Sequence, residues 1–102
     1  MFKIFSTRDV EKFISSLENS TIAKVLRVVD LLEKFGNQLA LPHSKKIGVS
    51  LFELRIKGRQ EIRIFYTFKN GSAIIFYGFI KKSQATPRRE IKLAKRKLKD
   101  LT

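Results

Sequence analysis

The spacing of apolar residues in the first third of the chain predicts a strand followed by a helix. Phe2–Phe5 is short, apolar and aromatic, which is typical of a β-strand. After Arg8 the apolar residues recur at positions i, i+3, i+4 and i+7, which lie on one face of a helix. These residues are Val10, Phe13, Ile14 and Leu17. Asn19-Ser20 then interrupts the helical period.

A second helix is predicted between this interruption and Gly36. Ser20 or Thr21 can act as its N-cap, and Gly36 provides the glycine that often follows a helix. The apolar stripe of this helix consists of Ile22, Val25, Leu26, Val29, Leu32 and Phe35. Because the connection between the two helices is tight, we expect an antiparallel helical hairpin.

Three strands are predicted in the second half of the chain, after an irregular segment. Asn37–Gly48 contains the breakers Pro42 and Gly48 and a polar, basic turn at 43–46. The strands are Ser50–Ile56, Glu61–Phe68 and Ser72–Ile80, joined by turns at 57–59 and at Asn70-Gly71, a strong hairpin signal. The third strand is apolar on both faces, so we expect it to lie centrally or to be covered on both sides.

A basic helix is predicted after the strands. Thr86 is its predicted N-cap, with Pro87 at the first helical position. Its apolar face carries Ile91, Ala94, Leu98 and Leu101. We therefore expect residues 1–102 to form one α+β domain, with an N-terminal strand, a helical hairpin, an antiparallel three-stranded meander and a C-terminal helix.

The charge of the chain narrows the choice of partner. The 22 Lys and Arg residues exceed the 9 Asp and Glu residues by 13, which favours a polyanion or an acidic protein as partner.

The absence of Cys excludes disulfides and a cysteine nucleophile, and a single His excludes zinc sites that need two imidazoles. The longest apolar run, Ala73–Ile80, is too short to span a bilayer, and the first residues do not resemble a signal peptide. We expect a cytoplasmic protein that does not bind membranes.

The motifs of common enzyme classes are absent from the sequence. It has no Gly-rich phosphate loop, no G-x-S-x-G and no H-E-x-x-H, and its acidic residues are too scattered to hold Mg²⁺. An activity on RNA would therefore use no metal and no cofactor, and the 2′-OH of the substrate would attack the adjacent phosphate. This chemistry needs a proton acceptor, cations around the phosphorane and a proton donor for the leaving oxygen. Arg, Lys, Tyr and His can fill these roles.

Arg55 and Arg63 are the first candidates for the cations. They occupy polar-facing positions of neighbouring predicted strands, so their side chains can converge on one face of a sheet. Glu53, two residues before Arg55, can orient a guanidinium. The alternative is that these residues form ordinary cross-strand pairs on a solvated face.

Tyr77, Tyr66 and His43 are the candidates for proton transfer. A tyrosine can donate a proton or stack on a base, but an aromatic residue in a central strand more often belongs to the core. His43 carries the only imidazole of the chain, although an isolated histidine in a loop is usually a surface residue.

Further basic residues are candidates for RNA backbone contacts. They are Arg59, Lys81, Lys82, Lys45, Lys46, Arg88 and Arg89. The basic helix that starts at Arg88 can neutralise phosphates of ribosomal RNA or dock onto an acidic neutralising protein.

The strands and the segment after them resemble the RelE/HigB family of bacterial and phage-derived toxins, in particular its phage-type HigB-like branch. Three stretches carry the resemblance: Leu51-Phe52-Glu53-Leu54-Arg55, Arg63-Ile64-Phe65-Tyr66, and Gly78–Pro87 with Glu90-Ile91 and Ala94. The resemblance implies a compact RelE-like α+β domain that enters the ribosomal A site and cleaves mRNA there. It also implies a cognate antitoxin, often a helix-turn-helix DNA-binding protein.

The resemblance also implies roles for individual residues. Arg55 and Arg63 match family arginines that stabilise phosphate charge, and Lys81 and Lys82 match the basic pair beside the site. Tyr77 stands where many relatives have His before Gly-Phe, which leaves the general acid open. We therefore expect the toxin of a type II toxin–antitoxin system, a ribosome-dependent mRNA endoribonuclease. The alternatives are a non-catalytic basic module that blocks translation by occupying the ribosome, and a degenerate toxin that only binds its antitoxin.

Overall fold

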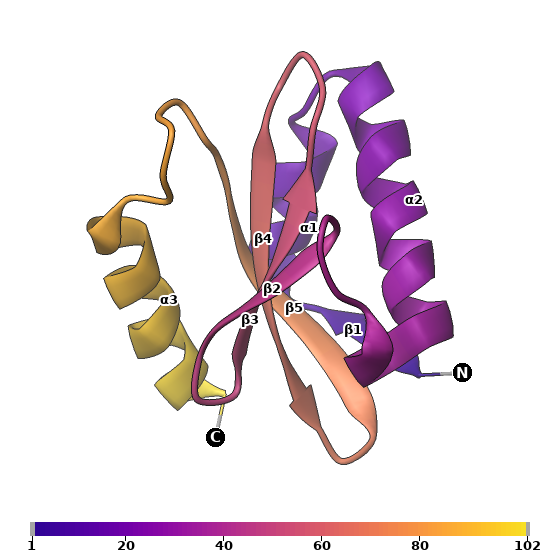
Figure 1. The fold of residues 1–102 in the computed structure, drawn as a ribbon, viewed down its shortest axis with the longest axis vertical. Coiled ribbons are helices and arrows are strands. Elements are labelled where there is room, and N and C mark those ends of the chain that lie inside the picture. Colours follow the sequence, from indigo (N-terminus) through magenta and orange to yellow (C-terminus); the bar gives the residue numbers. More distant parts are fainter. Residues whose placement is uncertain (1, 102) are drawn as a thin grey trace.

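A single mixed sheet with helices on both faces organises the protein (Figure 1). The computed structural model describes residues 2–101. In chain order their elements are β1 (Lys3–Ser6), α1 (Arg8–Ser15), α2 (Asn19–Phe35), the 3-10 turn η1 (Gly36–Gln38), β2 (Ser44–Gly48), β3 (Leu51–Ile56), β4 (Ile62–Lys69), β5 (Ser72–Ile80) and α3 (Arg88–Asp100). The strand order is β1-β5-β4-β3-β2, with β1 parallel to β5 and the other pairs antiparallel. The predicted α+β class is confirmed.

The two faces of the sheet bury two separate apolar clusters. Figure 1 shows α1 and α2 on one side of the sheet and α3 on the other. The α1/α2 side buries Val25 and Leu32 of α2 against Leu54, Ile64 and Ile75 of the sheet. The cluster on the α3 side consists of Leu51, Phe65, Phe76, Phe79 and Ala94. The prediction that the last strand is covered on both sides is confirmed, because β5 lies inside the sheet and contributes to both clusters.

A β-bulge in β5 determines which aromatic residues face α3. Phe65 pairs with Tyr77 and Tyr66 pairs with Ile75, so Phe76 is an extra residue without a partner in β4. Phe76 and Tyr77 therefore both pack in the cluster on the α3 side. Beyond the bulge Arg63 faces Phe79, close to the point where the chain leaves the sheet for α3.

The segment 37–48 is more ordered than its breakers suggest. Residues 39–43 are irregular or in a turn, as predicted, but the prediction of an irregular segment is wrong for 44–48, and so is the predicted turn at 43–46. Ser44–Gly48 forms the edge strand β2, which pairs with β3 through Ser44↔Leu54 and Lys45↔Glu53. The hydroxyl of Ser44 lies 2.6 Å from that of Tyr66, which ties the edge strand to the centre of the sheet. Pro42 precedes the strand and Gly48 ends it, so neither residue interrupts it.

Two helix starts and one apolar stripe also differ from the prediction. Helix α2 has Glu18 as its N-cap, and neither Ser20 nor Thr21 takes that position. Helix α3 has Pro87 as its N-cap, because the hydroxyl of Thr86 bonds elsewhere. The buried face of α2 is made by Thr21, Val25, Val28 and Leu32, while the predicted stripe residues Leu26 and Phe35 are 54% and 46% exposed. Compared with the predicted stripe, the buried face of α2 is rotated: it includes Thr21 and Val28 and leaves Leu26 and Phe35 at its outer margin.

No helix within residues 2–101 is long and apolar enough to cross a membrane.

We expect Gly78→Ala to destabilise the protein, because α1 packs closely on β5 at this position. A Cβ on residue 78 would lie 2.6 Å from ring atoms of Phe13 and 3.3 Å from Ile64. Overpacking of this kind lowers the free energy of unfolding by about 1–3 kcal/mol, which urea denaturation measures. Gly48→Ala is the matched control, because the nearest atom, Lys95 Cε, is 3.8 Å away. Its stability should stay within about 0.5 kcal/mol of the wild type. Equal effects of the two substitutions would contradict the close packing at Gly78.

Candidate functional site

A buried carboxylate on β3 holds two arginines together on the α3 side of the sheet. Glu53 is 0% exposed. Its Oε1 accepts a hydrogen bond of 3.1 Å from Arg55 Nε and lies 3.6 Å from Arg63 Nε. Arg55 and Arg63 are direct partners in the β3–β4 pairing, so the strand register brings the two guanidinium groups side by side. The alternative of ordinary pairs on a solvated face is wrong, because Glu53 and Arg63 are both buried.

The same carboxylate also binds the segment that connects β5 to α3. Thr86 Oγ1 donates a hydrogen bond of 2.8 Å to Glu53 Oε2. Each carboxylate oxygen thus has its own partner, one in the sheet and one in the connecting segment. Glu53 therefore places segment 81–87 relative to the arginine pair.

Arg63 is buried but has unused hydrogen-bonding capacity. Its side chain is 6% exposed, and its Nη1 donates to the carbonyl of Ile62 at 3.3 Å. Its Nε has no hydrogen-bond partner among the residues that the structure describes. Burial lowers the pKa of Arg63, and Arg55 lowers it further, while Glu53 and Glu61 act in the opposite direction. A buried guanidinium with an N–H that makes no hydrogen bond is suited to an anionic ligand.

Lys81 adds a third cation at the end of β5. Its backbone N–H donates to the carbonyl of Glu61 at 2.7 Å, and its Nζ lies 3.5 Å from Glu61 Oε2. The side chain is 7% exposed. Glu61 also lies 4.0 Å from Arg63 Nη2, so it links Lys81 to the arginine pair.

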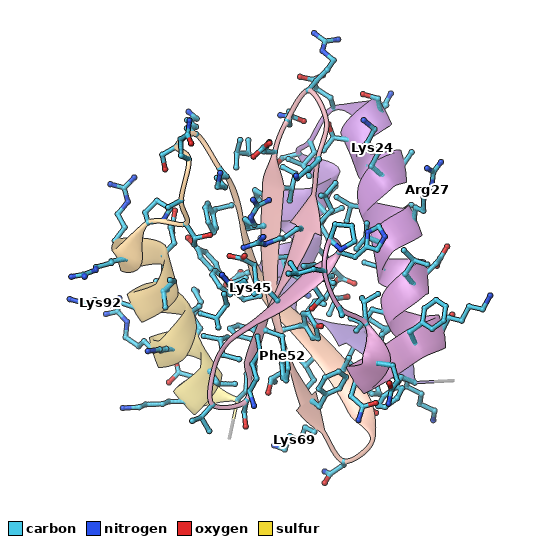
Figure 2. The ribbon with its side chains drawn as sticks, in the orientation of Figure 1. Lys24, Arg27, Lys45, Phe52, Lys69 and Lys92 are labelled. Carbon is cyan, nitrogen blue, oxygen red and sulfur yellow. The ribbon has the colours of Figure 1, made fainter. Side chains whose placement is uncertain are left out.

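Two adjoining hollows expose these cations to ligands. One, of about 380 Å³, lies between the sheet, segment 84–86 and the start of α3, and the other, of about 550 Å³, extends toward the β3–β4 turn. Both are lined by Arg55, Arg63, Lys81 and Gln84, and we call them together the arginine groove. Lys45 and Glu53 line only the first hollow, and Lys57, Lys82 and Glu61 line only the second. Figure 2 shows Lys45 on β2, between α3 and α2. Among the described residues, six cations thus face two carboxylates in the groove.

The structure brings five of the predicted site residues into this groove. They are Arg55, Arg63, Lys81, Lys82 and Lys45. The exposed Arg59 lies in the β3–β4 turn, 4.0 Å from Glu18, outside the groove. Lys46 lies over the ring of Phe52, on the opposite face of the sheet, and Arg88 and Arg89 are exposed in the first turn of α3.

Neither tyrosine lines the arginine groove. The hydroxyl of Tyr77 donates a hydrogen bond of 2.6 Å to Glu90 on α3, and its ring stacks on Phe65. Burial, with the hydrogen bond to Glu90 and the charge of that carboxylate, raises the pKa of Tyr77 to about 12. Tyr66 is 1% exposed and faces α2, and burial raises its pKa as well.

His43 lies beside Arg55 but on the side of α2. Its carbonyl accepts a hydrogen bond of 2.8 Å from the Arg55 backbone. Its side chain lines a third hollow, between α2 and β3, which also borders Arg55 and Lys57.

Lys57, Glu61 and Thr86 are site residues that the sequence reasoning did not single out. Lys57 follows Arg55 by two positions, so the alternation of the strand indicated it. The same alternation links Glu61 to Arg63. The contact of Thr86 with Glu53 joins residues far apart in the chain, and no local pattern indicates it. Within residues 2–101, no group of three His, Cys, Asp or Glu side chains is arranged to hold a metal ion.

Comparison with known proteins identifies the family. Residues 12–99 match the family of phage-derived Gp49-like proteins (DUF891), so the chain belongs to this family, which is associated with toxins of toxin–antitoxin systems. No curated protein shows significant sequence similarity to the chain.

We expect Glu53→Gln to destabilise the fold strongly. The substitution keeps the shape of the side chain but removes the buried carboxylate charge between the two guanidinium groups, so that only the more distant Glu61 opposes their repulsion. Removal of one partner from a buried ion pair costs about 3–5 kcal/mol, which chemical denaturation measures. Glu18→Gln is the control, because its pair with Arg59 is exposed, and the loss there should stay below about 1 kcal/mol. Wild-type stability of the Glu53 variant would show that the carboxylate does not organise the site.

Titration of the two tyrosines should show Tyr77 ionising near pH 12 in the folded protein. Because the folded pKa is above the unfolded value of about 10, this group stabilises the fold fully below pH 10 and loses that contribution between pH 10 and 12. Glu90→Gln should move the pKa of Tyr77 back toward 10. NMR of ¹³C-labelled tyrosine rings resolves the two residues, and an unchanged Tyr77 titration in the variant would contradict the assigned cause.

Proposed function

We propose that this protein is a toxin related to RelE and HigB that cleaves mRNA in the ribosomal A site. The observation that carries the proposal is the Arg55–Arg63 pair held by Glu53 at the arginine groove, where the buried Arg63 Nε makes no hydrogen bond to the described residues. The net charge of +13 and the membership in a toxin-associated family support the same assignment. The partner implied for the toxin is an antitoxin, of the helix-turn-helix class, encoded beside it.

The proposed reaction is an in-line attack of a ribose 2′-OH on the adjacent phosphorus. The new P–O bond forms as the bond to the 5′ oxygen of the next nucleotide breaks, and that oxygen takes up a proton from water, which leaves a 2′,3′-cyclic phosphate and a 5′-hydroxyl. Negative charge accumulates on the phosphate oxygens during this step. Arg55 and Arg63 stabilise that charge, and their partial burial strengthens the interaction because water screens it less.

The remaining cations bind the RNA backbone on either side of the reacting phosphate. Lys81, Lys82 and Lys45 line the groove, and Arg59, Arg88 and Arg89 extend the basic surface beyond it, while Lys46 lies on the opposite face of the sheet. Each phosphate that these residues neutralise steepens the salt dependence of binding, by about 0.7 log units per decade of salt for single strands.

We assign the proton transfer from the 2′-OH to His43. Of the two groups considered for this role, it is the one that adjoins Arg55. The hydroxyl of Tyr77 is engaged by Glu90, and its raised pKa makes it a weak acid.

Cleavage mapping on programmed ribosomes tests the proposed function. The purified protein is added to ribosomes that carry a defined mRNA, and primer extension locates the new ends. Discrete cuts in the A-site codon support the proposal. A stalled toeprint with intact mRNA would overturn it in favour of a basic protein that inhibits translation by occupancy.

Arg63→Ala should slow cleavage by about 10²–10³-fold, because one donor to the transition state is lost. The same variant should relieve growth arrest while it still binds the antitoxin. Circular dichroism tests whether the variant folds. Arg63→Lys keeps the charge but not the planar fork, and its cleavage rate should lie between those of the wild type and of Arg63→Ala. Arg96→Ala on the exposed side of α3 is the control and should behave as the wild type. Full toxicity of Arg63→Ala would remove Arg63 from the reaction.

A further inference from the structure

The hollow between α2 and β3 has a different character from the arginine groove that it adjoins. Its volume is about 240 Å³, and its walls include the apolar side chains of Val28, Pro42 and Ile56. Its rim carries the cations Lys24, Arg27 and Lys57. An apolar interior with a few polar groups at the rim is the usual form of a site for a small organic ligand.

This hollow shares two lining residues with the groove, although the groove lies on the α3 side of the sheet and the hollow on the side of α2. Arg55 and Lys57 line both the hollow and the groove. His43 stands at the border, since it lines the hollow and its carbonyl accepts a hydrogen bond from the backbone N–H of Arg55. Arg55 and Lys57 thus border both a ligand in the hollow and a phosphate in the groove.

Helix α2 carries two of the rim cations, Lys24 and Arg27, and both are exposed. Lys24 and Arg27 lie one turn apart on the upper half of α2 (Figure 2). Lys24 reaches the β3–β4 turn, because a Cβ built on Gly58 would lie 2.6 Å from its Nζ. The two residues have no part in the phosphate chemistry described above, and they add positive charge beside a mostly apolar hollow.

We propose that this hollow binds the nucleobase of the nucleotide whose 2′-OH attacks. The inference rests on the proposed function and deepens it. In a ribonucleotide the base and the 2′-OH are carried by neighbouring carbons of one ribose. A base in the hollow thus places its 2′-OH beside His43 and its 3′ phosphate beside Arg55.

The chemistry of the walls suits a base. The volume is below the 300–1,000 Å³ typical of sites for drug-sized molecules, and so fits one ring system. Bases bind in proteins by stacking on imidazole or guanidinium planes and by hydrogen bonds at their edges, which His43 and Arg27 supply. Because Lys24 and Arg27 are donors only, the hollow favours bases with acceptors at the edge, such as the O6 and N7 of guanine.

An abasic residue in the mRNA tests the proposal on programmed ribosomes. The abasic site replaces the nucleotide on the 5′ side of the mapped cut, and the cleavage rate is compared with that of the intact mRNA. A bound base contributes about 5- to 100-fold by stacking and edge contacts, so the wild type should cleave the abasic mRNA slower by that factor.

A Lys24→Ala/Arg27→Ala double variant separates base binding from general attraction to RNA. It should cleave intact mRNA more slowly than the wild type and lose little more on the abasic mRNA, because both changes remove the same interaction. A Lys12→Ala/Lys34→Ala variant removes the same charge from exposed positions of α1 and α2 and should respond to the abasic site as the wild type does.

The outcomes distinguish this inference from the function on which it rests. If the wild type cleaves both mRNAs at the same rate, or if the Lys24/Arg27 variant is slowed by the abasic site as much as the wild type, the base site is wrong and the nuclease stands. If the wild type cleaves neither mRNA, the proposed function fails and the base site fails with it.

Discussion

The carboxylate of Glu53, buried between two guanidinium groups, is the interaction on which the rest of the site depends. Arg55 and Arg63 face each other across neighbouring strands, and two like charges at such a distance repel unless an anion lies between them. Glu53 supplies that anion from within the same sheet face. Because it is fully buried, its attraction for the arginines is weakened little by water or salt. The protein can thus concentrate positive charge at one place without a ligand present.

The arrangement of layers explains why the concentrated charge lies where it does. On the α3 side, apolar residues fill the space under the helix from Leu51 to Phe79. Where β4 begins and β5 ends, the apolar residues give way to Arg63 and Lys81, and segment 81–87 runs over them before α3 begins. The bond between Thr86 and Glu53 closes this segment onto the sheet. One face of one sheet thereby serves as a hydrophobic core at one end and as a polar groove at the other.

Local pattern in the sequence was sufficient for much of the fold and for the arginine pair. The alternation in β3 and β4 predicted that Arg55 and Arg63 share a face, and Asn70-Gly71 correctly marked the hairpin that follows β4. The failures at β2 and at the start of α3 have a common physical origin, since each depends on a contact between distant residues. Ser44–Gly48 becomes a strand because β3 offers it an edge, and Thr86 does not cap α3 because Glu53 accepts its hydroxyl. The orientation of Tyr77 toward Glu90 likewise follows from the position of α3, which no residue near Tyr77 determines.

The parallel pairing of β1 with β5 has a consequence for how the molecule is made. Lys3–Ser6 is synthesised well before its partner Ser72–Ile80, which comes after most of the described residues. On a nascent chain the first strand therefore stays without its partner while the intervening helices and hairpins emerge, and such long-range closure slows folding. The groove needs Lys81 and Thr86, which follow β5. An incomplete translation product that stops before these residues carries the arginines but not the pocket that surrounds them.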